Sequence, residues 1–176
     1  MEVSASSAGT LRALRRLVRA LRLADRAAES RLGLSAAQLF VLERLSEGPA
    51  GSMAELAGRT LTDASSVSVV VHRLTERGLV VRATAPDDAR RTMLRLSTAG
   101  KRLLASAPRS PQVDLLEALE QLSATERREL ERLLEQVVRR MGIDENAPAP
   151  MLFEGEERSG RRTRVAGSRA RNRRRA

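Results

Sequence analysis

The amino-acid sequence predicts a mainly helical fold with one small β-hairpin, an α+β class, and three observations support this. Apolar residues make up 41% of the 176 residues but aromatic residues only 1%, so the core must consist of aliphatic side chains, which favours packed helices. Apolar residues recur at helical spacing along most of the chain. Only residues 79–85 and 92–97 have the composition of strands. The length suits one domain with a tail.

Residues 62–78 have the clearest helical pattern in the chain. Their apolar side chains fall at i, i+3, i+4 and i+7, which predicts one buried stripe made of Val67, Val70, Val71 and Leu74. Valine suits a strand by propensity, but the spacing is helical and packing usually overrides that preference. Thr62 or Asp63 can act as the N-cap, and Gly78 suits the left-handed residue that ends a helix.

The side of this helix opposite the stripe combines small hydroxyl side chains with one cation and one valine. By helical periodicity, this side holds Ser65, Val69, His72, Arg73 and Glu76, with Ser66 and Ser68 at its flanks. Hydroxyls and a cation suit a helix that approaches base edges and phosphates, and Val69 could contact a thymine methyl group. An ordinary solvated helix face is the alternative, and single exposed valines are common.

The segments on either side of this helix complete a known order of elements. Ser52-x-x-Glu55 is a capping box that predicts a short helix, followed by a turn at residues 59–61. After residue 78, the segments 79–85 and 92–97 predict two strands around a charged turn. Helix, turn, helix and β-hairpin is the order of a winged helix-turn-helix, whose second helix enters the major groove of double-stranded DNA. We therefore predict that the helix at 62–78 is the recognition helix.

The tip of the predicted hairpin, or wing, spans residues 86–91 and is rich in charge. Arg90 and Arg91 suit a wing that reaches a narrow minor groove, where the negative potential is concentrated. Asp88 could pair with Arg90 or with the sheet backbone and fix the shape of the loop; a solvated tip is the alternative. The predicted DNA contacts are therefore Ser65, Ser66, Ser68, Val69, His72, Arg73, Asp88, Arg90 and Arg91.

Further helices are predicted on both sides of the DNA-binding part, which spans residues 35–100. One helix covers residues 10–31, and others cover 98–142, with breaks at Pro108 and Pro111. Capping boxes at Ser35-x-x-Gln38 and Ser123-x-x-Glu126 mark two of the helix starts. The apolar stripes of the terminal helices exceed what a small domain needs, so we predict that they are dimerisation helices. A homodimer would place two recognition helices about 34 Å apart on a pseudo-palindromic operator.

Three segments are predicted to lie outside the domain of residues 10–142. Residues 1–9 should be disordered, residues 143–157 form an acidic linker, and residues 158–176 form a disordered tail with nine arginines and no acidic residue. Nine of the ten net positive charges belong to this tail, which leaves +1 for residues 1–157. Within that part, residues 52–102 carry +4 and residues 103–157 carry −6. The positive charge therefore lies where DNA is predicted.

The composition argues against several other functions. The chain has no cysteine, which excludes disulfides and cysteine-based zinc sites, and a single histidine cannot build a multi-histidine metal site. It has no nucleophile–histidine–acid arrangement and no phosphate-binding glycine loop, so we predict no enzyme activity, no metal and no cofactor. No apolar run is long enough to cross a membrane, and the N-terminus lacks the apolar core of a secretory signal. We therefore expect a cytoplasmic protein.

These motifs resemble those of the MarR family, the multiple-antibiotic-resistance type of bacterial transcriptional regulator. The resemblance covers about residues 11–141 and rests on four stretches, LSAAQLFVLERL, SMAELAGRT, SSVSVVVHRLTERGLVVR and PDDARRTMLRLSTAG. The last stretch is the most specific. Asp88 and Arg90 match the Asp and Arg of the family's wing motif, and Leu96, Ser97 and Gly100 close that motif.

The resemblance implies a homodimeric DNA-binding regulator, usually a repressor, that a small and often phenolic effector releases from DNA. It leaves the effector and its site unknown, and it does not extend to the arginine-rich tail. Val69 stands where many members have a cation and His72 where an Asp is common, so the operator readout should involve fewer charged base contacts. The alternative function is a non-specific nucleic-acid-binding or scaffold protein in which the tail does the binding.

Overall fold

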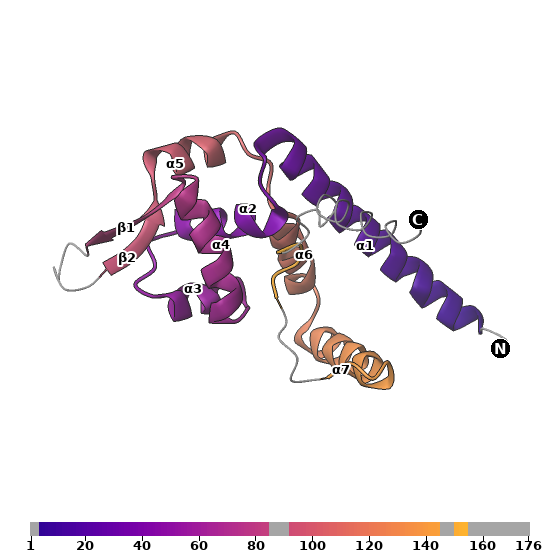
Figure 1. Ribbon diagram of the computed structural model, residues 1–176. Helices are drawn as coiled ribbons and strands as arrows, with labels where there is room; N and C mark the ends of the chain where they lie inside the picture. Colours follow the sequence, from indigo (N-terminus) through magenta and orange to yellow (C-terminus); the bar gives the residue numbers. More distant parts are fainter. Residues whose placement is uncertain (1–3, 85–91, 145–149, 155–176) are drawn as a thin grey trace, which may run out of the picture.

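The computed structural model describes residues 4–84, 92–144 and 150–154. In this part of the chain, seven helices and two strands follow one another in the order shown in Figure 1. Their bounds are α1 Ala5–Leu32, α2 Ala36–Ser46, α3 Met53–Thr60, α4 Ala64–Glu76, β1 Val80–Thr84, β2 Thr92–Leu96, α5 Thr98–Ala105, α6 Pro111–Glu120 and α7 Ala124–Arg140. The predicted class, mainly helical with a two-strand wing, is confirmed.

Each helix begins at a small polar residue whose side chain satisfies backbone amides of the first turn. The capping boxes predicted at Ser35 and Ser123 are both present. The one predicted at Ser52 is only half formed. Its hydroxyl accepts a hydrogen bond from the Glu55 amide at 3.0 Å, whereas the Glu55 carboxylate accepts from the Gly51 amide at 2.7 Å instead of from Ser52. The sequence therefore placed these helix starts correctly.

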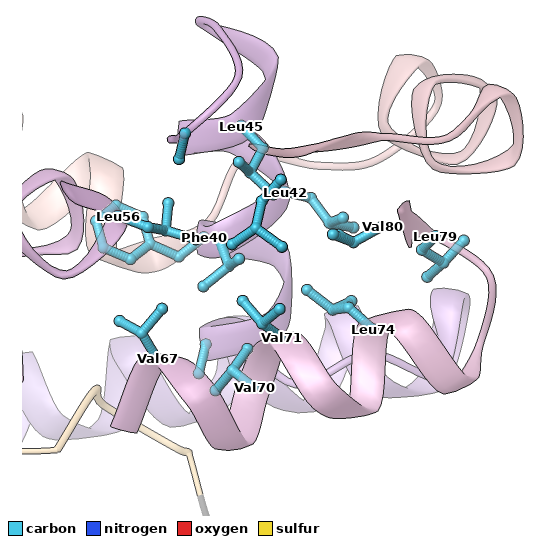
Figure 2. Packing of buried hydrophobic residues seen from close by; sticks show 14 of the residues in the cluster. Phe40, Leu42, Leu45, Leu56, Val67, Val70, Val71, Leu74, Leu79 and Val80 are labelled. Atoms are coloured by element: carbon cyan, nitrogen blue, oxygen red, sulfur yellow. The ribbon is translucent and has the colours of Figure 1, made fainter. Parts of the chain in front are cut away.

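The core lies where α2, α3, α4 and the wing meet. Figure 2 shows Val67, Val70, Val71 and Leu74 of α4 on one side of this cluster, facing Phe40 and Leu42 of α2. All four α4 side chains are at most 1% exposed, as the periodicity predicted. Aliphatic burial of this kind stabilises the fold by about 1.5–3 kcal/mol for each large side chain. The outward face of α4 is thereby fixed by the burial of its inward face.

The wing is a two-stranded antiparallel sheet in which Val80 pairs with Leu96 and Thr84 with Thr92. Ala50, in the loop between α2 and α3, extends it by one bridge, because its amide and carbonyl both bond to Leu94 at 2.9 and 2.7 Å. This bridge ties the base of the wing to the start of α3. The two strands therefore leave the core in a fixed direction, seen at the left of Figure 1.

The structure corrects two sequence predictions about helix boundaries and one about burial. The first helix begins at Ala5 rather than at Thr10, with the Ser4 hydroxyl as its cap, so residues 5–9 are helical and not disordered. Helix α3 extends through Thr60, and the turn is made by Leu61 at φ +53°. Met151, assigned to the acidic linker, is only 5% exposed and belongs to the core cluster.

Helices α1 and α7 extend away from this core and leave apolar side chains exposed. Figure 1 shows α7 apart from the other labelled elements, and none of its residues is buried. Its exposed apolar residues are Leu133, Leu134 and Val137, and exposed Met141 follows directly at its C-cap. On α1 the corresponding residues are Leu11, Leu14, Leu17, Val18 and Leu23. Large exposed apolar stripes of this kind mark interaction surfaces in soluble proteins.

Candidate nucleic-acid interface

Helix α4 is held at its start by Asp63, which settles the choice of N-cap left open by the sequence. The Asp63 carboxylate accepts hydrogen bonds from the Ser66 amide at 2.8 Å, from the Ser66 hydroxyl at 3.0 Å and from the Ser65 hydroxyl. These bonds, with the Ser65 hydroxyl first, lower the Asp63 pKa from 3.8 to about 2. At its other end the helix is followed by Gly78 at φ +67°, as predicted.

The side of α4 opposite the core is open to solvent. Ser65, Ser68 and Val69 are exposed there, and Val69 retains 44% of its accessible surface. His72 lies on the same side one turn further on, with Nε2 3.5 Å from a Glu76 carboxylate oxygen. Because the predicted face is not packed into the protein interior, it remains available to a partner.

A cleft beside this face brings a further cation to α4. It is lined by residues of α3, α4 and β1, namely Met53, Ser68, Val71, His72, Thr75 and Arg82. Arg82 is an exposed residue of β1 and was not among the predicted site residues. Strand alternation alone does not tell which helix faces a given strand residue, so the helical pattern of residues 62–78 could not identify it.

Ser66 does not belong to the exposed face, which corrects one predicted contact. It is only 6% exposed, and its hydroxyl donates to Asp63 at 3.0 Å. Helical periodicity placed Ser66 at the flank of the face. At such a position, a small rotation of the helix decides whether the side chain points into solvent or packs against the protein. The bond to the N-cap uses the hydroxyl that was predicted to contact DNA.

Arg73 also lies at the flank and points toward another part of the chain. Its Nη1 donates to the backbone carbonyl of Glu154 at 3.1 Å, and its side chain is half-buried. The predicted role in DNA contact therefore has to compete with this internal bond. The three predicted wing contacts, Asp88, Arg90 and Arg91, lie outside the described residues.

Among residues 4–84, 92–144 and 150–154, no group of three or more histidine, cysteine or acidic side chains is arranged to hold a metal ion. None of the helices in the same ranges has the length and apolarity to cross a membrane.

A short helix α3 that packs against α4, a turn at Leu61, the exposed face of α4 and a β-hairpin together define a winged helix-turn-helix protein. Residues 32–91 match the sequence model of the MarR family. The HTH-type transcriptional repressor Rv2887 of Mycobacterium tuberculosis is 30% identical over 111 residues, which span 63% of this chain and 80% of that protein. The chain belongs to the MarR family of transcriptional regulators, which are not enzymes.

Other relatives agree with this assignment. A Thauera aromatica protein named for regulation of the hcr operon is 33% identical over 109 residues, and the match spans 62% of this chain and 64% of that protein. The solved structure of the Streptomyces coelicolor regulator PcaV, in complex with its natural ligand, is similar at a TM-score of 0.51. It is 27% identical, and the match covers 79% of this chain and 98% of that one. This chain thus spans less than two thirds of the length of the Thauera aromatica protein.

Proposed function

We propose that this protein binds a pseudo-palindromic operator in double-stranded DNA as a homodimer and thereby represses transcription. The observation on which the proposal depends is the outward face of α4, where Ser65, Ser68 and Val69 are exposed while the opposite face is fixed in the core. A rigidly held helix with small side chains can enter a major groove closely.

Within this proposal the residues have different roles. Val69 contacts a thymine methyl group, and Ser65, Ser68 and His72 bond to base edges or phosphates. Arg82 adds a phosphate contact beside the helix, because it lines the same cleft as Ser68 and His72. Asp88, Arg90 and Arg91 place the wing in the adjacent minor groove.

The dimer is proposed from the exposed stripes of α1 and α7. Each stripe presents four or more large apolar side chains that nothing covers within the described part of one chain. Packing them against a second copy across a two-fold axis removes this surface from water and fixes the separation of the two α4 helices. Operator symmetry would then mirror protein symmetry.

The decisive experiment is selection of bound duplexes from a random DNA pool with the full chain. We expect an inverted repeat whose half-sites are about one helical turn apart, and specific binding at least about 10³-fold tighter than binding to random DNA. The variant Arg90→Ala should weaken operator binding while leaving the dimer intact. A pool without any enriched repeat would refute sequence-specific binding.

The arginine-rich tail offers a second explanation of DNA binding, favoured by the nine positive charges of residues 158–176. In that case binding would be non-specific and dominated by phosphate contacts. A chain ending at Glu157 separates the two explanations. If it retains preference for the selected repeat, the winged helix reads the sequence; if all binding disappears, the tail was responsible.

We further propose that a small-molecule effector relieves repression. This rests on the likeness to PcaV, whose structure was solved with its natural ligand. A panel of phenolic acids added to the protein–operator complex should contain at least one compound that releases the DNA. Unchanged operator affinity across such a panel would count against effector control of this class.

A further inference from the structure

A second cleft lies at the base of the wing, away from the exposed face of α4. It is formed by the end of α2 and the loop after it, by β2 and by α5, which Figure 1 shows beside the base of the wing. None of its lining residues belongs to α3 or α4. Its volume of about 420 Å³ lies within the range of about 300–1,000 Å³ that is typical of small-molecule sites. We call it the wing-base cleft.

The wing-base cleft combines an apolar floor with charged groups of one sign. Leu45 and Leu96 are each 3% exposed, and Leu104 is half-buried. Arg95 and Lys101 are exposed and line the same cleft, and no described acidic residue lines it. Among the residues that the structure describes, neither of these two cations forms an ion pair.

These groups suit a small molecule that has an apolar body and a single negative charge. A carboxylate gains charge-assisted hydrogen bonds from a guanidinium or an ammonium group. The three leucines would remove an apolar ring or chain from water. A neutral ligand would gain nothing from the cations, and a small inorganic anion would gain nothing from the leucines.

Strand alternation directs Arg95 away from the side of the wing that carries Arg82. Arg95 pairs with Val81, and paired residues of neighbouring strands point to the same side of a sheet. Val81 and Arg82 are consecutive and therefore point to opposite sides. Because Arg82 lines the cleft beside α4, Arg95 is available to a different ligand from the phosphate proposed for Arg82.

The loop between α2 and α3 connects the wing-base cleft to the DNA-binding elements. Gly48 and Pro49 line the cleft, and their carbonyls both accept hydrogen bonds from Arg59 of α3 at 2.8 Å. The next residue, Ala50, bonds to Leu94 of β2 at 2.9 and 2.7 Å. A ligand in the cleft therefore contacts the segment that holds both α3 and the wing.

We propose that the wing-base cleft binds a small apolar monocarboxylate and that this binding weakens operator binding. The proposal deepens the proposed effector control, and its regulatory part rests on the proposed function. Residues 52–102 carry a balance of +4, and a bound anion lowers this charge, which reduces the attraction to DNA phosphates. By linkage, the operator must weaken carboxylate binding by the same factor, about fivefold or more.

Binding is tested with benzoate and its neutral analogue benzamide on the full chain without DNA. Benzoate should shift the methyl resonances of Leu45, Leu96 and Leu104 with a dissociation constant of about 1 mM. Benzamide should bind at least about fivefold more weakly. Arg95→Gln and Lys101→Gln should each weaken benzoate binding about threefold, and the double variant about tenfold, because each removes one exposed charge partner.

Two further variants distinguish the wing-base cleft from positive charge in general. Arg102→Gln removes the same charge at an exposed neighbour on α5 that does not line the cleft, so it should bind benzoate as the native chain does. Ala105→Phe places a ring in the cleft from an exposed position at the end of α5 and should abolish benzoate binding.

The regulatory part is tested with an operator duplex obtained from the random pool. Saturating benzoate should lower the operator affinity of the native chain about fivefold or more. The double variant Arg95→Gln, Lys101→Gln should lose this response, whereas Arg102→Gln should keep it. An unchanged operator affinity of the native chain in saturating benzoate would overturn the regulatory role.

The other outcomes separate this proposal from the proposed function. No binding of benzoate at about 10 mM, equal binding of benzamide, or methyl shifts confined to α1 and α7 would overturn the site. Release of DNA by a phenolic acid that the double variant leaves unchanged would also overturn it, while effector control stands. If Lys101→Gln weakened operator binding and its salt dependence without benzoate, this cation would bind phosphate instead. A random pool without an enriched repeat would refute the proposed function but leave the benzoate measurement valid.

Discussion

At the scale of single residues, Glu43 of α2 is the most unusual charged group in the described part of the chain. One carboxylate oxygen accepts a hydrogen bond from the Ser110 amide at 2.8 Å, and the other is buried and finds no hydrogen-bond partner among the described residues. Burial raises the pKa of Glu43, against the smaller opposing effects of the Ser110 amide and of Arg44 and Arg109. Asp114 adds to the increase.

We expect the variant Glu43→Gln to raise the melting temperature at pH 7–8. Because the pKa of Glu43 is higher in the folded than in the unfolded protein, its protonated form stabilises the fold. This stabilisation is complete at pH values below the unfolded-state pKa, and it is lost as the pH rises through the folded-state pKa. Glutamine keeps the accepting oxygen but removes the buried charge. The gain should therefore shrink toward pH 4, which thermal unfolding at several pH values will measure. A gain that is independent of pH would contradict this assignment.

Glu117 of α6 provides a control, because its pKa is shifted in the opposite direction to that of Glu43. The guanidinium of Arg109 donates hydrogen bonds to its carboxylate and lowers the pKa of Glu117. The ionised Glu117 therefore stabilises the fold at pH values above its unfolded-state pKa, and this stabilisation is lost as the pH falls through the folded-state pKa. Glu117→Gln should lower the melting temperature at pH 7, and the loss should vanish in acid; because the pair is exposed, the effect should be small.

Residues at the flanks of α4 show how far sequence periodicity resolves a binding face. The centre of the face, including Ser65, Val69 and His72, is exposed as predicted. Ser66 and Arg73 are about one residue's rotation away from that centre, and both bond within the chain. Periodicity locates a face but does not tell which neighbouring group will approach its edge.

At the scale of elements, the junction of α5 with the wing depends on Gly100. A Cβ atom there would lie 2.2 Å from the carbonyl oxygen of Leu79, a backbone atom that cannot move aside. The same carbonyl accepts a hydrogen bond from the Ser97 amide at 3.0 Å. The glycine in the LSTAG stretch therefore permits the first turn of α5 to touch the backbone of Leu79, directly before β1.

The variant Gly100→Ala should destabilise the fold by about 3 kcal/mol, because overpacking against backbone forces the two elements apart. Urea unfolding monitored by circular dichroism measures this change. Gly58→Ala is the matched control, since nothing lies within 4 Å of a Cβ at that exposed helical position. It should be neutral or stabilise the fold by up to about 1 kcal/mol. Equal stabilities for the two variants would contradict the close approach.

At the scale of the whole molecule, α7 is a helix whose apolar face is not covered by the described part of the chain. Its backbone is well capped by Ser123 and Glu126, yet none of its residues is buried. An amphipathic helix of this kind gains stability mainly from packing of its apolar face. We therefore interpret α7, together with α1, as half of an interface with a second copy.

We expect Val137→Glu to dissociate the dimer. Val137 is 50% exposed in the single chain, and a carboxylate at this place would be buried and unpaired in the interface. A cost of about 3 kcal/mol corresponds to a roughly hundredfold weaker dimer. Sedimentation at several concentrations measures this change, and the unfolding of the winged helix should be unaffected.

Thr125→Glu is the control for this variant because it puts the same charge on the opposite side of α7. Thr125 is exposed in the first turn, where a carboxylate interacts favourably with the helix dipole. The Thr125→Glu protein should dimerise with the same affinity as the native chain. If Val137→Glu also left the dimer intact, the interface would lie elsewhere.

The sequence by itself determined the local features of this protein. Capping residues, the valine stripe of α4, the two strands and the glycine at the end of α4 all follow from interactions between residues three or four apart, or from alternation along a strand. The tertiary structure alone decided what covers each face. Composition assigned Met151 to a linker, because burial depends on contacts between segments far apart in the chain, and neither charge nor periodicity records those contacts. The assignment of residues 5–9 to disorder failed for a local reason, since the Ser4 hydroxyl caps the helix that they begin.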